Sequence, residues 1–387
     1  IGAASFVLLG LACARFFSRR VGLIAGLALA LWAPAIFFDS LLQKAVLDMF
    51  FMCLGLWLIA GIGDRGSGIG RALALGASMA ALSLSRENGL LLVGVVAIWL
   101  WFLDRRRILY FVAGLAIVFA PVVARNYSID GGFYLTTSQF GSNFYIGNNP
   151  NADGTYASIR FGRGAPEFER LDAKEVAEES VGRALSPSEV SSFWTGRALG
   201  YITSQPVSWL KLTGRKILLL FNRTEMLDTE AQESYAEFST PLKVLGWITH
   251  FGILMPLAIA GMIAAWPERR RLSIVYALAI AYAFSVVMFF VFARYRYPLV
   301  PCLILFAAAP FDSRVRDYIA HTFTQGKSKK WLMAATIAGV AIFSNWPVLS
   351  PTPLTRRNPR RSALRLEIGK KGGKAGRVLF LLGRALI

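Results

Sequence analysis

Residues 88–124 read NGLLLVGVVAIWLWFLDRRRILYFVAGLAIVFAPVVA. Two apolar runs, 88–103 and 107–124, are separated here only by a short charged turn. A run of this length crosses, or nearly crosses, a hydrocarbon core of about 30 Å as an α-helix. The turn carries three consecutive arginines, residues that membrane proteins concentrate on the cytoplasmic side. The stretch therefore predicts two membrane-spanning helices joined on that side.

The same pattern recurs along the chain of 387 residues, of which 55% are hydrophobic. Soluble domains are usually roughly 45–50% apolar. We expect ten spans, at approximately residues 2–17, 21–38, 43–62, 71–85, 88–103, 107–124, 243–265, 272–293, 296–311 and 331–349. The predicted fold class is an all-α polytopic membrane protein with one mixed exported loop domain.

The charges between these runs alternate along the chain. Five turns are rich in basic residues and are predicted to be cytoplasmic; they hold Arg15/Arg19/Arg20, Arg65/Arg71, Arg105–Arg107, Arg269–Arg271 and Arg314/Arg316/Lys327/Lys329/Lys330. The turns between them are predicted to lie outside; they hold Asp39/Lys44, Arg86/Glu87, a long polar loop and Arg294/Arg296. Ten spans fit this alternation until the basic tail, which falls outside.

The formal net charge of +19 is compatible with a nucleic-acid partner, but its distribution is not. Residues 125–242 hold 11 Lys and Arg against 14 Asp and Glu, whereas the rest of the chain holds 31 against 9. The excess therefore lies in short turns, where it sets membrane orientation. We expect membrane lipid, and no nucleic acid, as a partner.

We divide the chain into four parts: 1–124 with six spans, an exported loop domain at 125–242, 243–349 with four spans, and a basic tail at 350–387. Within the loop, residues 127–163 have the composition of turns and short extended pieces. A surface helix is expected at 173–185. The tail ends in a spacing of Leu, Gly and Ala that faintly resembles one tetratricopeptide helix pair.

Two further helices are predicted in the loop. Ser186-Pro187-Ser188-Glu189 is an S-x-x-E capping box with Pro at the first helical position, and its helix should run to about Thr203. Gln205-Pro206 begins the next helix, whose apolar stripe from Trp209 to Leu220 includes Lys216. This helix either lies on the membrane surface or packs on the loop domain.

Sequence motifs for soluble catalysis are absent: there is no dinucleotide-binding or phosphate-binding glycine loop, no HExxH and no nucleophile elbow. The three cysteines lie inside apolar runs without CxxC spacing, and only His250 and His321 are present. We expect no metal site, no disulfide and no cofactor. No charged segment precedes the first apolar run, so no signal peptide is expected.

Charges at the outer ends of the predicted spans remain as candidate functional groups. Lys44 and Asp48 share one helix face, four residues apart, where a charge usually faces an interior or a wet cavity. The alternative is a local ion pair. Arg86 and Glu87 form a very short turn between two apolar runs, and a plain surface turn would also tolerate them.

Arg294 and Arg296 are flanked by tyrosines in VFARYRYPLVP. The tyrosines suit a membrane interface, where the arginines would only extend toward water. Together with Lys44 and Arg86, however, they place four cations at one membrane face. This arrangement suits a lipid phosphate.

The start of the loop, GSNFYIGNNPNADGTY at 141–156, is rich in Gly and Asn. Such residues favour turns. One hypothesis is a structural turn that begins the loop domain. The other is that Tyr145, Asn148 and Asn149 touch a sugar or an acceptor.

With these residues in view, the chain resembles the GT-C membrane glycosyltransferases, and most closely the bacterial family 39 proteins related to protein O-mannosyltransferases and aminoarabinose transferases. The resemblance rests on five stretches in order, and spans residues 1 to about 310. They are ARFFSRRVGLIAGLALALWAPAIFFDSLLQKAVLDMF, LSLSRENGLLLV, VVARNYSIDGGFYLTTSQFGSNFYIGNNPNADGTY, FWTGRALGYITSQPVSWLKLTGRKILLLFN and FARYRYPLVP.

The resemblance implies a GT-C-like helix bundle in the bacterial inner (plasma) membrane, with the large loop in the periplasm or outside the cell. It implies transfer of a sugar from a polyprenyl-phosphate donor to an acceptor hydroxyl, with inversion at the anomeric carbon. Lys44, Arg86, Arg294 and Arg296 would hold the departing phosphate. Asp48 matches a region where relatives carry a second acid, and is the catalytic candidate. The sugar and the acceptor, whether protein, lipid or glycan, stay open.

The chain departs from the family at one point. The family's principal catalytic acid follows its first transmembrane helix, whereas this chain opens with what resembles the second or third helix. We therefore expect an N-terminally truncated sequence, also because it begins with Ile. Two alternatives remain: a transporter or flippase of a lipid-linked or anionic substrate, and a non-catalytic scaffold. The sequence shows neither the inverted repeats nor the broken helices of transporters.

Overall fold

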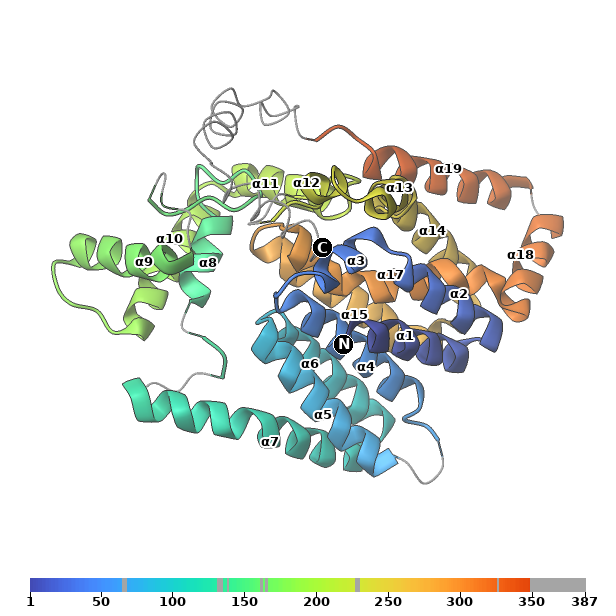
Figure 1. The fold of residues 1–387 in the computed structure, drawn as a ribbon, viewed down its shortest axis with the longest axis horizontal. Helices are drawn as coiled ribbons and strands as arrows, with labels where there is room; N and C mark the ends of the chain where they lie inside the picture. The colour runs from blue at the N-terminus through green and yellow to red at the C-terminus, as the bar shows by residue number, and fades with distance from the viewer. Residues whose placement is uncertain are drawn as a thin grey trace, which may run out of the picture. The chain divides into compact units, whose positions relative to one another are not determined.

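The computed structural model describes residues 1–64, 68–130, 135–137, 139–160, 163, 166–226, 230–325 and 327–348. It divides into two compact units, Ile1–Trp346 and Pro347–Ile387. The tetratricopeptide-like segment expected in the tail lies outside the described residues. Over the described ranges the chain is helical, and no residue there is in a strand (Figure 1).

The helices follow the apolar runs closely. In the first 130 residues they are α1 Gly2–Phe16, α2 Arg19–Ala30, α3 Ala33–Asp39, α4 Ala45–Ala60, α5 Gly68–Ser85, α6 Gly89–Leu103 and α7 Arg105–Asp130. The middle of the chain forms α8 Phe140–Gly147, α9 Pro166–Val181, α10 Pro187–Ser204, α11 Pro206–Leu220 and α12 Gln232–Ala236. The rest forms α13 Thr240–Ile248, α14 Phe251–Ala264, η1 Trp266–Glu268, α15 Arg269–Met288, α16 Ala293–Arg296, η2 Tyr297–Leu299, α17 Val300–Ala308, η3 Ala309–Phe311, α18 Ser313–Gln325 and α19 Lys327–Ser344.

By length and composition, three helices of the described chain can cross a membrane, at Gly68–Ser85, Arg105–Ile129 and Trp266–Met288. Three bent pairs raise this to six if each pair is one span: Arg19–Ala30 with Ala33–Asp39 at 59°, Thr240–Ile248 with Phe251–Ala264 at 41°, and Ala293–Phe311 with Ser313–His321 at 66°. Shorter apolar helices occupy the other predicted spans. The all-helical, membrane-compatible fold is thus present, while the count of ten spans stays a prediction.

The bent pairs correct the expectation that broken helices are absent. Two of the bends brace each other, because the Ala33 amide in the first pair donates to Thr249 Oγ1 in the second at 2.9 Å. Trp32 and Phe251 meet edge to face at the same place, with ring centroids 6.2 Å apart. Pairing between the two bends satisfies backbone and side-chain groups that a break in each helix would otherwise expose.

The helices α5 and α7 pack closely (Figure 1). A Cβ built on Gly76 would lie 2.0 Å from the Phe111 carbonyl oxygen, and one on Gly114 would lie 2.0 Å from that of Leu73. Only glycine permits this approach, a device common between membrane helices. The outer face of α7 carries exposed apolar side chains, among them Leu109 and Ile117.

The five turns predicted to be cytoplasmic meet at one end of the helices. Asp64, between α4 and α5, pairs with Arg15 at 3.2 Å and with Arg71 at 2.8 Å. The other three turns are joined to this end through backbone carbonyls: Arg107 donates to Ile62, Arg271 to Phe16, and Arg314 to Phe17. All five turns that were predicted to be cytoplasmic therefore lie at a common end of the bundle.

The loop between α7 and α13 corrects a second expectation. We predicted turns and short extended pieces at 127–163, whereas α7 continues to Asp130, α8 is helical, and the described residues of this region include no strand. Aromatic side chains at helical spacing explain α8. Phe140 and Phe144 stack 5.7 Å apart, and both contact Phe289, at 5.5 and 5.9 Å.

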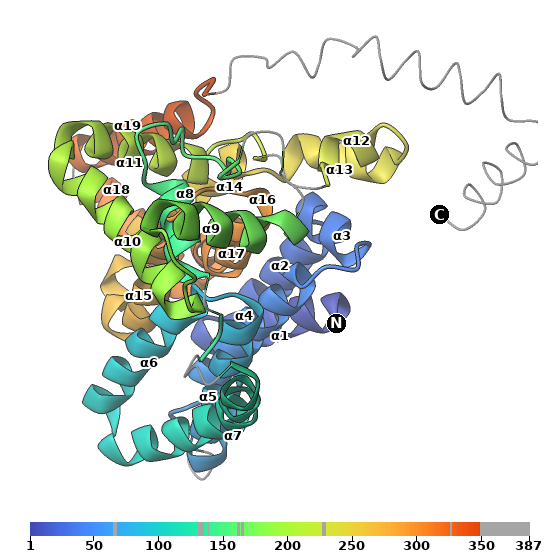
Figure 2. The same ribbon diagram turned by 90° about the vertical axis from the view of Figure 1, so that its left-hand side faces the viewer.

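The helices α8, α9 and α11 each pack against α10, as the turned view in Figure 2 shows. The predicted capping box begins α10: the Glu189 amide donates to Ser186 Oγ, and the Ser186 amide donates to Glu189 Oε2 at 2.8 Å. Pro206 begins α11 as expected. Its buried face, which includes Leu212, Lys216 and Leu219, packs toward α10 and α15.

Candidate functional site

A buried ion pair lies at the other end of α4 and α5, away from the basic turns. Asp48, in the first turn of α4, is fully buried, and Arg86, directly after α5, is 6% exposed. Arg86 Nε and Nη2 approach the same carboxylate oxygen, Asp48 Oδ2, at 2.7 and 2.6 Å. The second oxygen, Oδ1, is buried and meets no hydrogen-bond partner among the described residues. The carboxylate therefore orients Arg86.

Two more predicted cations gather around this pair. Lys44, the residue before α4, is exposed, and its ammonium lies within electrostatic range of Arg86, Asp48, Arg294 and Glu87. Arg294 is partly exposed. We call Lys44, Asp48, Arg86 and Arg294 the charge cluster; it joins residues about 250 positions apart in the sequence.

Aromatic and polar contacts position the charge cluster. Tyr295 lies between its two arginines: the Cζ of Arg86 is 4.5 Å from the ring centroid and that of Arg294 is 5.4 Å. The Tyr282 hydroxyl on α15 donates to the Tyr295 carbonyl at 3.0 Å. The α15 helix also fixes the turn after Arg86, because Asn88 Nδ2 donates to Ser285 Oγ at 3.1 Å. Rigid helices thus hold both arginine-bearing turns.

Glu87 lies beside this site and faces another segment. The Thr137 hydroxyl donates to its carboxylate. It lowers the net positive charge around Lys44 but does not bind the arginines of the charge cluster through any described contact.

Arg296, the fourth predicted phosphate ligand, lies apart from the charge cluster and is bonded within the protein. Its side chain is fully buried, and it pairs with Glu225 through Nη2 at 2.7 Å and Nε at 3.1 Å. Its other donors go to backbone carbonyls, with Nη1 on Leu219, Leu220 and Asn222, and Nη2 on Thr224. Every guanidinium nitrogen is therefore bonded to the last turn of α11 or to the segment after it.

Asn148 uses its side-chain amide for hydrogen bonds within the protein. It is fully buried, its Nδ2 donates to the carbonyls of Phe144 at 2.9 Å and Met288 at 2.7 Å, and its Oδ1 accepts from Trp209 Nε1 at 3.0 Å and Lys216 Nζ at 3.1 Å. One amide thus joins α8, α11 and the end of α15.

The two neighbours predicted to contact substrate are also committed to the turn. Asn149 Nδ2 donates to the carbonyls of Tyr145 at 3.0 Å and Ile146 at 3.1 Å, while its Oδ1 accepts from the Asn151 amide. The Tyr145 ring packs against Trp194, with centroids 4.6 Å apart. Of the two hypotheses for 141–156, the geometry supports the structural turn.

Lys216 is a buried cation whose environment the sequence analysis missed. Its side chain is fully buried and donates only to Asn148 among the described residues, and burial lowers its pKa to about 7. Its position in the middle of an apolar stripe was the available signal. The fold uses it to hold the turn at Asn148.

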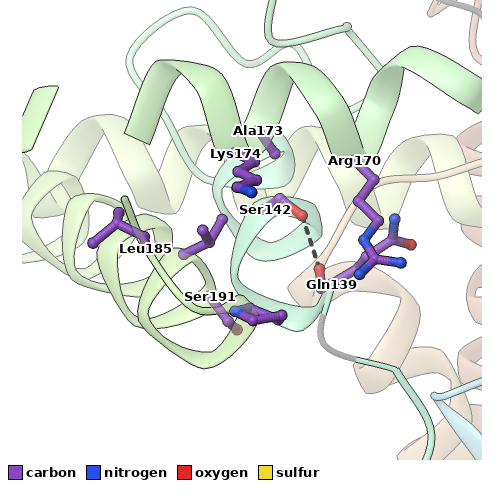
Figure 3. A pocket seen from close by; sticks show the side chains of 9 residues that line it. Gln139, Ser142, Arg170, Ala173, Lys174, Leu185 and Ser191 are labelled. Atoms are coloured by element: carbon purple, nitrogen blue, oxygen red, sulfur yellow. Dashed lines mark hydrogen bonds between the residues drawn. The ribbon is translucent and has the colours of Figure 1, made fainter. Parts of the chain in front are cut away.

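A cavity of about 400 Å³ is the second feature that the sequence analysis missed. It lies between α3, the segment 223–225, α12 and α13, and is lined by Glu225, Glu233 and His250 among others. Binding sites for small molecules commonly measure about 300–1,000 Å³. A smaller hollow of about 100 Å³ lies between α8, α9 and α10, where Gln139, Ser142, Arg170 and Lys174 meet (Figure 3).

Comparison with known proteins adds no relative. No family model, curated protein or solved structure matches the chain. Nor do the described residues contain a group of three or more His, Cys, Asp and Glu side chains that could hold a metal ion.

Proposed function

We propose that this chain is a membrane glycosyltransferase of the GT-C type that transfers a sugar from a polyprenyl-phosphate donor to an acceptor hydroxyl. One observation carries the proposal: Arg86 pairs with the buried Asp48 carboxylate at one end of the apolar helices, and Lys44 and Arg294 lie beside this pair, Lys44 within electrostatic range of the other three residues and Arg294 over the Tyr295 ring that Arg86 also contacts. The resemblance of five ordered stretches to this family implies that the cations bind the phosphate of the donor. The enzyme would act at the outer face of a bacterial inner membrane.

The charge of the cluster suits the leaving group. In the transfer, the acceptor oxygen forms a bond to the anomeric carbon, and the bond from that carbon to the phosphate oxygen breaks with its electron pair on the phosphate. The phosphate therefore gains one negative charge as the sugar leaves. Among the described residues, three cations against Asp48 and Glu87 leave a positive balance there, and preorganised positive groups stabilise such developing charge.

The residues of the cluster take different roles. Asp48 is fully buried and ion-paired, so we assign it to orienting Arg86 rather than to accepting the proton of the acceptor hydroxyl. Lys44 and Arg294 are more accessible and would contact the phosphate directly. The proton of the acceptor hydroxyl would pass to a carboxylate outside the charge cluster.

Binding of polyprenyl phosphate to the purified chain in lipid nanodiscs tests the proposal. Lys44→Ala and Arg294→Ala should each weaken binding about 10- to 100-fold, since a charge-assisted hydrogen bond contributes about 1.5–3 kcal/mol. Arg20→Ala, an exposed arginine at the other end of the bundle, is the matched control. Unphosphorylated polyprenol should bind all variants equally. Wild-type affinity for polyprenyl phosphate in both cluster variants would refute the phosphate site.

The bent helix pairs favour a second candidate, a transporter or flippase of a lipid-linked substrate, because broken helices commonly line transporter sites. A flippase would bind the same phosphate but would move the lipid between leaflets without cleaving it. Movement of a fluorescent polyprenyl-phosphate sugar across proteoliposomes, with the sugar–phosphate bond intact, would decide for this candidate.

A further inference from the structure

The cavity of about 400 Å³ beside α12 and α13 contains polar atoms that the described residues leave without well-formed hydrogen bonds. His250 is 8% exposed, and its Nδ1 makes no hydrogen bond of good geometry within the described part of the chain. Over the same ranges, Gln232 Oε1 is buried without a hydrogen-bond partner, and the contact of Glu225 Oε1 is its ion pair with Arg296. All three residues line the cavity. Buried polar atoms without partners are costly, and a ligand that donates hydrogen bonds would satisfy them.

The charges around the cavity are balanced. Within the described ranges, three cations and three carboxylates line it or pair with its lining: Arg223, Lys243 and Arg296, and Glu225, Glu233 and Glu237. A phosphate would meet the carboxylates, and a strongly cationic ligand would meet the cations. The cavity therefore suits a neutral ligand rich in hydroxyl groups.

The walls of the cavity add an apolar surface. Trp247 lines it with an indole that is 69% exposed, and aromatic rings of this kind combine an apolar face with a polar edge. The two braced helix bends supply another wall, through Pro34 and Thr249. Irregular backbone among apolar helices is tolerated where it lines a cavity.

The cavity also adjoins residues next to the charge cluster. A small hollow shares Pro34, Glu225, Gln232 and Glu233 with it, and its remaining walls include Phe38 and Ala293. Ala293 directly precedes Arg294 in the chain. Phe38 packs on Tyr297, with ring centroids 4.8 Å apart, and Tyr297 is within electrostatic range of Asp48. A ligand in the cavity would thus approach the phosphate from the side of Ala293.

We propose that this cavity binds the acceptor, and that the acceptor is a carbohydrate whose hydroxyl groups donate to Glu225, Gln232 and His250. That the ligand is an acceptor rests on the proposed function. That the ligand is a carbohydrate rests on the unsatisfied polar atoms and the balanced charge of the cavity. It selects a glycan among the protein, lipid and glycan acceptors that the sequence leaves open.

Binding of methyl glucoside to the full chain tests this inference, measured by saturation-transfer NMR in lipid nanodiscs prepared without glycosidic detergents, whose head groups would compete. Wild-type protein should bind saturably. Gln232→Leu and His250→Leu should each weaken binding about two- to twelvefold, since a net hydrogen bond contributes about 0.5–1.5 kcal/mol. Gln205→Leu, an exposed amide at the start of α11, is the matched control and should bind as wild type.

The outcomes separate this inference from the proposed function. Gln232→Leu should keep wild-type affinity for polyprenyl phosphate, which reports folding and the phosphate site together, while losing affinity for the glycoside. Equal glycoside binding by wild type and both variants, or no saturable binding by wild type, would overturn the carbohydrate site. Tighter binding of a serine- or threonine-bearing peptide than of the glycoside would also overturn it, in favour of a protein acceptor. Neither result bears on Lys44 and Arg294.

Discussion

Arg294 and Arg296 lie two positions apart in one short helix, yet they have opposite roles. Arg294 is partly exposed beside Lys44, whereas Arg296 is fully buried and bonded to Glu225 and four carbonyls. The sequence predicted Lys44, Asp48, Arg86 and Arg294 at one membrane face, and the structure brings these four side chains near one another. The sequence could not assign Arg296, because its partners come from residues about 70 positions earlier, whose backbone conformation no local pattern specifies.

Substituting Arg296 should therefore lower the thermal stability of the protein. Arg296→Met leaves the Glu225 carboxylate and several carbonyls without donors, and loss of one partner from a buried pair costs about 3–5 kcal/mol. Thermal unfolding in nanodiscs should show a clearly lower Tm for Arg296→Met and a nearly unchanged Tm for Arg294→Met. Equal Tm values for the two variants would contradict the structural role of Arg296.

Lys216 makes stability depend on pH. Burial lowers its pKa in the folded protein to about 7, against about 10.4 in an unfolded chain. Between about pH 7 and pH 10, the unfolded chain binds a proton there that the folded protein does not. Stability should rise with pH through this window by about 1.4 kcal/mol per unit, and the slope should vanish below about pH 7, where both states bind the proton.

The variant Lys216→Met should abolish this slope, as measured by unfolding at several pH values between 7 and 10. Lys211→Met, an exposed lysine on the same helix, should retain it. If Lys216→Met and wild type show the same pH dependence, Lys216 is not the responsible group. The assignment would also be contradicted if the stability of wild type fell from pH 7 to pH 9 while that of Lys216→Met did not.

At the scale of elements, helix positions could be predicted and helix bends could not. Apolar runs and charged turns locate α4, α5, α6 and the start of α7 within about three residues, since each run must be helical to satisfy its own backbone. The bends at α2–α3 and α13–α14 depend on each other, through the Ala33 amide and Thr249 Oγ1. Such pairing between distant segments leaves no periodic signal in either one.

The close packing of α5 on α7 gives a prediction at this scale. Gly114→Leu would force a side chain against the Leu73 carbonyl and should destabilise the protein by about 1–3 kcal/mol or more. Gly94→Leu on α6 is the control, because a Cβ there meets nothing within 4 Å. Unfolding in nanodiscs should lower the Tm of Gly114→Leu alone. A larger loss for Gly94→Leu would show that α5 and α7 do not pack this way.

For the whole molecule, the pattern of charges predicts which end of the bundle faces the cytoplasm. The three native cysteines are buried, so a new surface cysteine can report on orientation. Ser180→Cys lies on the predicted exported loop, and Ser273→Cys lies near Arg269–Arg271 at the predicted cytoplasmic end. A membrane-impermeant maleimide applied to spheroplasts should label Ser180→Cys at once and Ser273→Cys only after permeabilisation.

Wild-type protein, with only buried cysteines, is the background control for this labelling. The reverse pattern would invert the topology, and immediate labelling of both cysteines would place the two segments on one side. Either result would move the charge cluster away from the membrane face on which polyprenyl-linked sugars are expected to be used by this protein.

The arginines at the basic end serve twice. Arg107, Arg271 and Arg314 carry the charge that guides how helices enter a membrane. In the folded protein Arg107 donates to a carbonyl just after α4, and Arg271 and Arg314 donate to carbonyls at the end of α1. A lysine would supply the same charge during insertion, but not the rigid guanidinium fork that reaches the carbonyl. Choice of orientation and its subsequent locking thus fall to the same side chains, so that replacing arginine by lysine at this end would produce a correctly oriented protein that is more easily pulled apart.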